Sequence, residues 1–184
     1  MKKIFATSIS FFLLFFLTGC QSNSDEQLTE VPVTHENLTI EQLVEISSLP
    51  IQLPTQLPFE PIDTLITFDD YKELYGDGDQ IEEIFVNYIK TFREGRYVEV
   101  VISNLRDANE GGETVLLENG TEAVYSEDNI GQLLVWTEGN VSYRLIYYTS
   151  DKVNEGQDPL PLEEFIAIAN SFQQIGRASC RERV

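Results

Sequence analysis

The sequence predicts an α+β domain, in which an antiparallel, curved β-sheet of about six or seven strands carries a short N-terminal helix and a C-terminal helix packed on it. Between residues 62 and 149, short runs rich in β-branched and aromatic residues alternate with turn sequences. Apolar residues at helical spacing lie before and after this region. The chain has 184 residues, of which 42% are hydrophobic, enough for one ordinary domain with attachments.

Residues 1–19 are typical of a lipoprotein signal peptide. Two lysines precede an apolar run over residues 4–17, which is too short for a comfortable membrane span but suits a secretory signal. The run ends in Leu-Thr-Gly-Cys, which resembles the bacterial lipobox. The resemblance implies cleavage between Gly19 and Cys20, and a diacylglyceryl group on the Cys20 thiol. An ordinary signal peptide or an anchor helix with an incidental cysteine is the alternative.

The polar, acidic residues 20–37 are expected to form a flexible tether, followed by a single globular domain over residues 38–174. The last ten residues, 175–184, match the translation of a widely used sequencing adapter. We therefore expect a non-native tail, in which Cys180 has no chemical role. A genuine basic tail is the alternative.

The first predicted helix spans residues 40–48. Thr39 and Gln42 have the spacing of a capping box, and Pro50 ends the helix. The prolines that recur from residue 50 to residue 61 exclude a helix and a central strand, so an extended edge segment is expected there. A proline-rich recognition ligand is the alternative.

The next segments predict paired strands. Residues 62–68 form one strand, and residues 81–92 fit either a helix or a strand. Because Glu94-Gly95 and an alternating run over residues 97–103 follow, the sequence favours a hairpin and hence a strand for residues 81–92.

Two further hairpins and a helix complete the domain. Asn119-Gly120 joins the strands of residues 114–117 and 121–125, and a Glu-Gly-Asn turn joins those of residues 132–137 and 141–149. Pro161 occupies a first helical position, ahead of an apolar stripe that runs from Leu162 to Ala169.

The charge and the histidine content exclude several functions. The formal charge is −19, and because the signal and the tail each contribute +2, residues 20–174 carry −23. Nucleic acid is therefore not an expected partner, whereas basic partners are attracted; plain solubility is the simpler explanation of the charge. His35 is the only histidine and lies in the expected tether, so a catalytic triad and a zinc site lack their parts. We expect no enzyme, no catalytic residue, no metal and no cofactor.

Two groups of residues could bind a ligand. Asp77, Asp79 and Glu82 are oxygen donors near a flexible Gly-containing loop and could hold calcium, although a solvated turn explains them equally well. The aromatic residues of the last hairpin, above all Trp136, Tyr143 and Tyr147 together with Tyr148, could form a platform for an apolar or peptide ligand. Aromatic residues at strand spacing are more often core or cross-strand pairs, and that interpretation is favoured here.

The final third of the sequence resembles the family called domain of unknown function 4367. The resemblance rests on the Asn119–Ala123 turn, the Leu133–Trp136 strand, Tyr143–Leu145 and the helix from Leu162 to Ser171. It implies an extracytoplasmic module of membrane-anchored proteins in spore-forming bacteria. It assigns no functional residue.

These observations together predict a lipoprotein that Cys20 anchors, through diacylglyceryl and palmitate-type chains, on the extracytoplasmic face of the cell membrane in a Gram-positive type of envelope. The acidic domain is expected to be a non-catalytic binding or sensing module for an envelope protein or peptide, linked to envelope signalling or sporulation. The alternative is a carrier of acyl or lipid cargo that resembles lipoprotein-sorting carriers.

Overall fold

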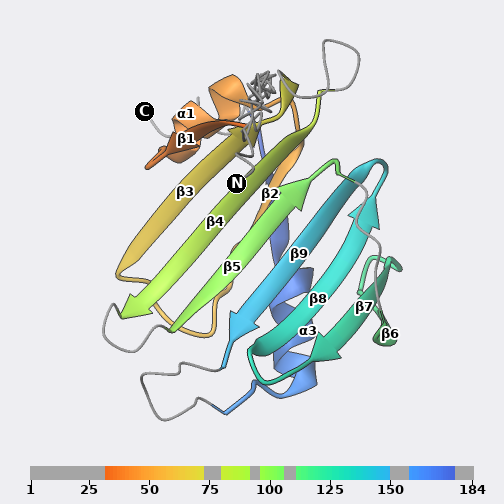
Figure 1. The fold of residues 1–184 in the computed structure, drawn as a ribbon. Helices are drawn as coiled ribbons and strands as arrows, with labels where there is room; N and C mark the ends of the chain where they lie inside the picture. The colour runs from red at the N-terminus through yellow and green to blue at the C-terminus, as the bar shows by residue number, and fades with distance from the viewer. Residues whose placement is uncertain (1–31, 73–79, 92–95, 106–110, 150–157, 177–184) are drawn as a thin grey trace, which may run out of the picture.

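The computed structural model describes residues 32–72, 80–91, 96–105, 111–149 and 158–176 (Figure 1). Gly19 and Cys20, the whole predicted signal peptide and residues 177–184 lie outside the described residues.

The main layer is an eight-stranded sheet in which all neighbouring strands are antiparallel. Its strand order is β1-β3-β4-β5-β9-β8-β7-β6, so most strands lie beside the strand that precedes or follows them in the chain (Figure 1). The strands are β1 (Val33–Glu36), β3 (Asp63–Asp70), β4 (Glu82–Thr91), β5 (Arg96–Ser103), β6 (Glu113–Leu116), β7 (Glu122–Glu127), β8 (Gly131–Glu138) and β9 (Val141–Tyr148).

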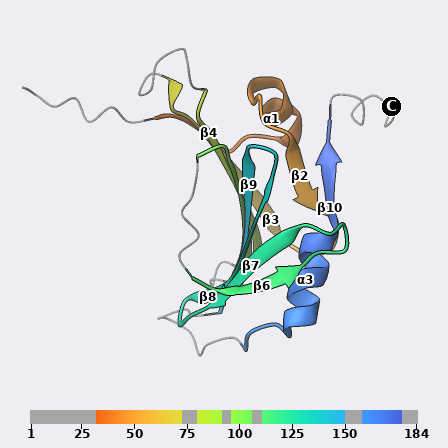
Figure 2. The same ribbon diagram turned by 90° about the vertical axis from the view of Figure 1, so that its right-hand side faces the viewer.

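A second layer covers one face of this sheet. It contains the helices α1 (Ile40–Ile46) and α3 (Leu162–Asn170), and a two-stranded sheet of β2 (Ile51–Pro54) and β10 (Phe172–Ile175). Figure 2 shows these four elements on the same side of the main sheet. No described helix or strand lies on the opposite side (Figures 1 and 2).

Local sequence signals explain how α1 and β2 are placed. The Thr39 hydroxyl accepts a hydrogen bond from the Gln42 backbone N–H, and the Gln42 side chain accepts one from the Thr39 backbone N–H. This capping box satisfies two donors that a helix leaves free at its start, and it confirms the predicted N-terminus. The chain is extended at Ser47, and the proline-dense segment continues into β2.

The core lies between the two layers and follows the alternation of the strands. On β4, β5 and β9 every second side chain points to the covered face, where it packs against α1, β2 and α3. Leu43 of α1 and Phe165 of α3 are fully buried there. The strand residues involved are Ile84, Val86, Tyr88, Val98, Val100, Ile102, Tyr143, Leu145 and Tyr147.

The structure confirms an α+β fold with a mostly antiparallel sheet and two helices, but two finer predictions are wrong. The main sheet has eight strands rather than six or seven, and it is open at β1 and β6 rather than curled. β1 lies within the range expected to be a tether, and β10 extends to Ile175, one residue into the expected tail. Both are four-residue strands with little apolar alternation, so their pairing with β3 and β2 forms them.

The segment whose sequence fits either a helix or a strand forms the strand β4 over residues 82–91. β4 pairs with β3 on one side and with β5 on the other, and the cross-strand partners continue through eight residues on each side. This confirms the strand interpretation, because β4 packs apolar side chains at spacing two and not at helical spacing.

Candidate binding surface

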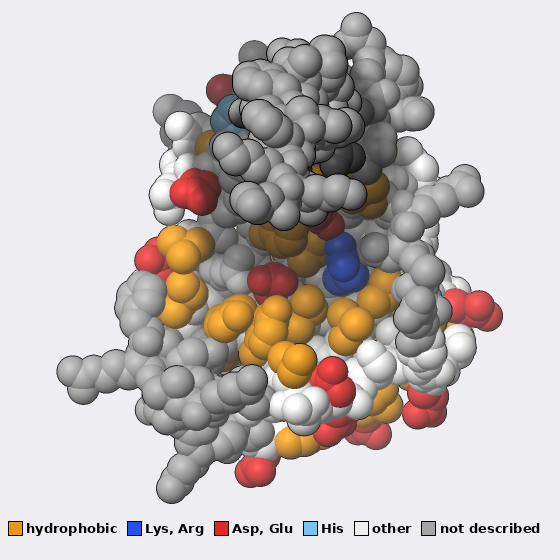
Figure 3. All heavy atoms as spheres, in the orientation of Figure 1, with side chains coloured by type: hydrophobic (Ala, Val, Ile, Leu, Met, Phe, Trp, Pro, Cys, Tyr) orange, Lys and Arg blue, Asp and Glu red, His pale blue; other side chains and the backbone are white. Residues whose placement is uncertain are grey.

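The side of the main sheet opposite to the helices, here called the open face, carries the side chains of the remaining strand positions. Figure 3 shows this side, where apolar side chains surround acidic and basic ones. Cross-strand pairing places the central positions of β4, β5, β9 and β8 next to one another. Among the described residues of the five central strands, the open face comprises Asp63, Leu65, Thr67 and Asp69 of β3, Glu83, Phe85, Asn87 and Ile89 of β4, Tyr97, Glu99, Val101 and Ser103 of β5, Ser142, Arg144, Ile146 and Tyr148 of β9, and Leu133, Val135 and Thr137 of β8.

An ion pair lies near the centre of the open face. The Arg144 Nη2 atom is 2.7 Å from Glu83 Oε1, and the two side chains are 28% and 11% exposed. Tyr71 donates a further hydrogen bond of 3.4 Å to the other Glu83 oxygen. The pairing offsets part of the free-energy cost of removing both charges from water.

A second carboxylate, Glu99, lies beside two tyrosine rings. The Tyr97 and Tyr148 ring centroids are 4.3 Å apart, and the Tyr148 hydroxyl donates a long hydrogen bond of 3.4 Å to Glu99 Oε1. Burial raises the pKa of Glu99 above its ordinary value, while the Tyr148 hydrogen bond and the Arg144 charge act less strongly in the opposite direction. In the described part of the chain Glu99 forms no ion pair.

Apolar side chains surround these charged groups. Phe85 pairs with Val101 across β4 and β5, and Leu133 pairs with Ile146 across β8 and β9. All four are buried or half-buried, although they project away from the helices. A surface of this composition can exclude water around a polar contact and so strengthen it.

The predicted aromatic platform is formed on the covered side and not on a surface. Trp136, Tyr143 and Tyr147 are only 2%, 0% and 6% exposed. Trp136 stacks on Tyr143 with centroids 5.5 Å apart, and the Tyr143 hydroxyl donates a 2.9 Å hydrogen bond to the Pro50 carbonyl. The structure therefore brings these rings together as core, in agreement with the favoured interpretation, and they cannot present a platform to a ligand.

Of the rings on the open face, the sequence interpretation named Tyr148 as part of the aromatic platform but not Phe85 and Tyr97. Phe85 and Tyr97 lie on the same strands as the core residues but at the alternate positions. The alternation of β5 and β9 was the available signal, since it divides each strand into two faces. This alternation does not show which of the two faces the helices cover.

The calcium hypothesis has no geometric support in the described residues. Asp77 and Asp79 lie outside them, and Glu82 is buried, where its carboxylate accepts hydrogen bonds from Ser47 Oγ at 2.8 Å and from the Ser48 backbone N–H at 2.9 Å. Glu82 thus connects the end of α1 to β4. Within the described ranges, no three His, Cys, Asp or Glu residues are arranged to hold a metal ion.

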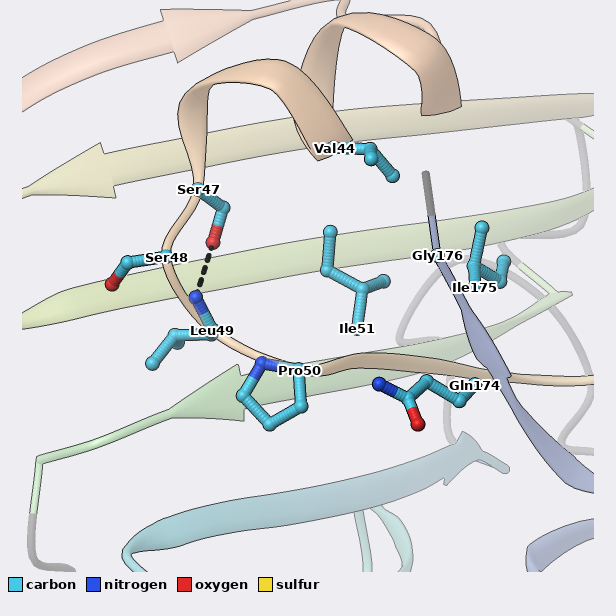
Figure 4. A pocket seen from close by; sticks show the side chains of 9 residues that line it. All are labelled: Val44, Ser47, Ser48, Leu49, Pro50, Ile51, Gln174, Ile175 and Gly176. Atoms are coloured by element: carbon cyan, nitrogen blue, oxygen red, sulfur yellow. Dashed lines mark hydrogen bonds between the residues drawn. The ribbon is translucent and has the colours of Figure 1, made fainter. Parts of the chain in front are cut away.

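A pocket of about 420 Å³ lies beyond the end of α1, beside the paired ends of β2 and β10 (Figure 4). Ser47, whose hydroxyl accepts a 3.1 Å hydrogen bond from the Leu49 backbone N–H, lies on one side. Ile175 and Gly176 form part of the opposite wall. Since these two residues belong to the expected adapter-derived tail, the open face is the stronger candidate site.

His35, the single histidine, lies on β1, where its ring stacks on Phe68 with centroids 5.9 Å apart. Among the helices that the structure describes, none has the length and apolar character needed to cross a bilayer. Comparison of the chain with protein-family models, with curated proteins and with solved structures finds no significant match.

Proposed function

We propose that this chain is a membrane-anchored extracytoplasmic lipoprotein whose domain is a non-catalytic binding or sensing module, and that its open face contacts another envelope protein or a peptide. The observation that supports this proposal is the asymmetry of the main sheet. One face packs a filled core against helices, whereas the other presents aromatic and aliphatic side chains around charged groups without a described element on it.

The anchor is the first part of the proposal. The lipobox-like motif that ends at Cys20 would place two acyl chains on the mature N-terminus, which suffices for stable membrane attachment. The resemblance to domain of unknown function 4367 is consistent with an extracytoplasmic module, and a link to envelope signalling or sporulation follows from that resemblance alone.

A carrier of acyl or lipid cargo is less well supported. Such a carrier needs a sheet that curls around an apolar cavity, and the main sheet is open. The rings that would line such a cavity on the covered side, Trp136 and Tyr143, pack against Phe172 and the neighbouring core. Lipid bound to the open face would give lipid adducts in the crosslinking experiment described next.

Photo-crosslinking from the open face in intact cells tests the proposal. A photoreactive amino acid replaces Leu133 on the open face in one variant and the exposed Glu163 of α3, on the other side of the main sheet, in the control. We expect one discrete protein adduct from position 133 and none from position 163. We expect Ile146→Asp to abolish the adduct because it places a charge beside Leu133. Mass spectrometry identifies the adduct.

The other outcomes contradict the proposal. Adducts with lipid only would favour the carrier, and equal protein adducts from both positions would indicate non-specific collisions. For the anchor, Cys20→Ala should abolish labelling by radioactive palmitate and release the protein from the membrane. Unchanged labelling would refute the assignment of Cys20.

A further inference from the structure

Glu99 is the one carboxylate of the open face that lies against aromatic rings and lacks a cationic partner in the described chain. Asn87 and Ile146 are its cross-strand neighbours, so both adjacent strands place uncharged side chains beside it. Arg144 also lies on β9, but its guanidinium contacts Glu83 at 2.7 Å. The charge of Glu99 is therefore only partly compensated by the residues that the structure describes.

The two rings beside Glu99 suit the same kind of ligand group as the carboxylate. Tyr97 and Tyr148 are opposite one another on β5 and β9, and Glu99 follows Tyr97 on the same face. A ring face attracts a cation within about 6 Å of its centroid, more strongly when the cation is desolvated. A carboxylate beside a pair of packed tyrosine rings thus offers a cation both an opposite charge and the outer, electron-rich surface of the ring pair.

The net charge of the open face also indicates a cationic occupant. Among the described residues of the five central strands, Asp63, Asp69, Glu83 and Glu99 contribute four negative charges to this face against one positive charge on Arg144. A second copy of this chain would bring the same excess, because the whole sequence carries −19, and an anionic lipid surface would be repelled as well. A basic segment of a different polypeptide is the complementary partner.

The extent of the open face fits a segment rather than a large domain interface. Strands of eight residues are about 26 Å long, and the five strands from β3 to β8 span about 24 Å, so the face covers roughly 600 Å². Stable complexes bury about 800 Å² of accessible surface per partner, which is more than the outline of this face. An extended or helical segment with apolar side chains around one basic residue matches both the size and the composition.

We propose that Glu99, Tyr97 and Tyr148 form a subsite of the open face that receives the lysine or arginine side chain of a partner polypeptide, while Phe85, Val101 and Ile146 contact the apolar side chains beside it. This inference rests on the proposed function and specifies the chemistry of the partner. The ammonium or guanidinium group lies beside the Tyr97–Tyr148 ring pair, whose centroids at 4.3 Å leave no room between the rings, and pairs with the Glu99 carboxylate. The apolar surroundings reduce the competition from water.

Synthetic peptides test the subsite. The probe is an acetylated and amidated decapeptide of alternating valine and serine with one central lysine, and the matched peptide carries the neutral norleucine instead. Calorimetry measures the affinity of both peptides for the full acylated chain in detergent, and the ring resonances of Tyr97 and Tyr148 report the location of binding. We expect the lysine peptide to bind at least tenfold more tightly and to shift both tyrosine resonances.

Three variants separate the subsite from the general acidity of the chain. Glu99→Gln keeps an acceptor for the Tyr148 hydroxyl and should abolish the preference for lysine. Glu163→Gln removes the same amount of charge from an exposed position of α3, on the other side of the main sheet, and should preserve the preference. Tyr148→Leu should reduce the preference several-fold, because it removes one ring but leaves the carboxylate.

The proposal is overturned if the two peptides bind equally, if neither binds, or if Glu99→Gln retains the preference for lysine. In each of these cases a protein adduct from position 133 would still support the proposed function. If that adduct is absent while the lysine peptide binds through Glu99, the subsite is present and the assignment of an envelope partner fails.

Discussion

Replacement of Arg144 by methionine is expected to destabilise the protein measurably, because it leaves Glu83 charged and largely buried. The lost hydrogen bond of 2.7 Å joins two ionised groups, a type of interaction that contributes about 1.5–3 kcal/mol. A fully buried unpaired charge would cost about 3–5 kcal/mol. Since the Arg144 side chain is 28% exposed and water screens part of the interaction, we expect a loss of about 2 kcal/mol in the free energy of unfolding.

A double-mutant cycle isolates this pair from the other contacts of the two residues. Glu83→Gln removes the buried charge and keeps the length of the side chain, so the combined variant should lose only about 1 kcal/mol relative to the wild type. Urea denaturation of all four proteins at pH 7 measures the coupling. Raised salt should weaken it little, because the pair is mostly shielded from solvent.

Two results would refute this reasoning. A cost below about 0.5 kcal/mol for Arg144→Met would mean that water solvates Glu83 adequately once its partner is gone. An additive cycle, in which the double variant loses the sum of both single losses, would mean that the two side chains do not stabilise each other.

Three further predictions concern Glu99, Glu82 and Tyr143. Burial raises the folded-state pKa of Glu99, so the ionised side chain destabilises the fold at pH 7. Glu99→Gln should therefore increase the free energy of unfolding at pH 7, and this gain should disappear as the pH falls below the ordinary pKa of 4.5. Urea titrations at pH 7 and below that pKa measure the difference. Glu82→Ala leaves the Ser47 hydroxyl and the Ser48 N–H without their acceptor and should cost about 3 kcal/mol, whereas Glu82→Gln should cost about 1 kcal/mol in the same assay. Tyr143→Phe should cost about 1 kcal/mol but leave the affinity for the lysine peptide unchanged, since this ring lies on the covered side; a tenfold loss of affinity in calorimetry would contradict that placement.

The central hairpins were predictable from sequence because their signals are local. Asn119-Gly120 favours the positive backbone angles of a tight turn, and Gly120 has φ of +85°. The capping box at Thr39 is equally local, since its partners lie three residues apart. Strand alternation also identified the inward residues of β5, such as Val98 and Ile102.

The edges of the fold could not be predicted in the same way. β1 has the sequence Val-Thr-His-Glu and four exposed side chains, so nothing in its composition distinguishes it from a tether. It becomes a strand because its backbone pairs with β3. β10 likewise depends on β2, which is more than one hundred residues earlier in the chain.

The candidate site needed the tertiary structure for a similar reason. Alternation places Tyr143 and Tyr147 on one face of β9 and Arg144 and Tyr148 on the other. Both faces contain aromatic residues, so composition does not select between them. The packing of α3 and the β2/β10 pair covers the first face, whereas the described residues place no helix or strand on the second face.

Chemical footprinting of the tyrosine side chains in intact cells tests most directly the claim that the open face binds a partner. Tyr148 lies on the open face, whereas the Tyr125 ring packs against Phe165 on the covered side and serves as the control. The account predicts that Tyr148 is modified more slowly in the membrane of living cells than in the purified acylated protein, while Tyr125 reacts at the same rate in both. Equal rates for Tyr148 in cells and in the purified protein would contradict the account.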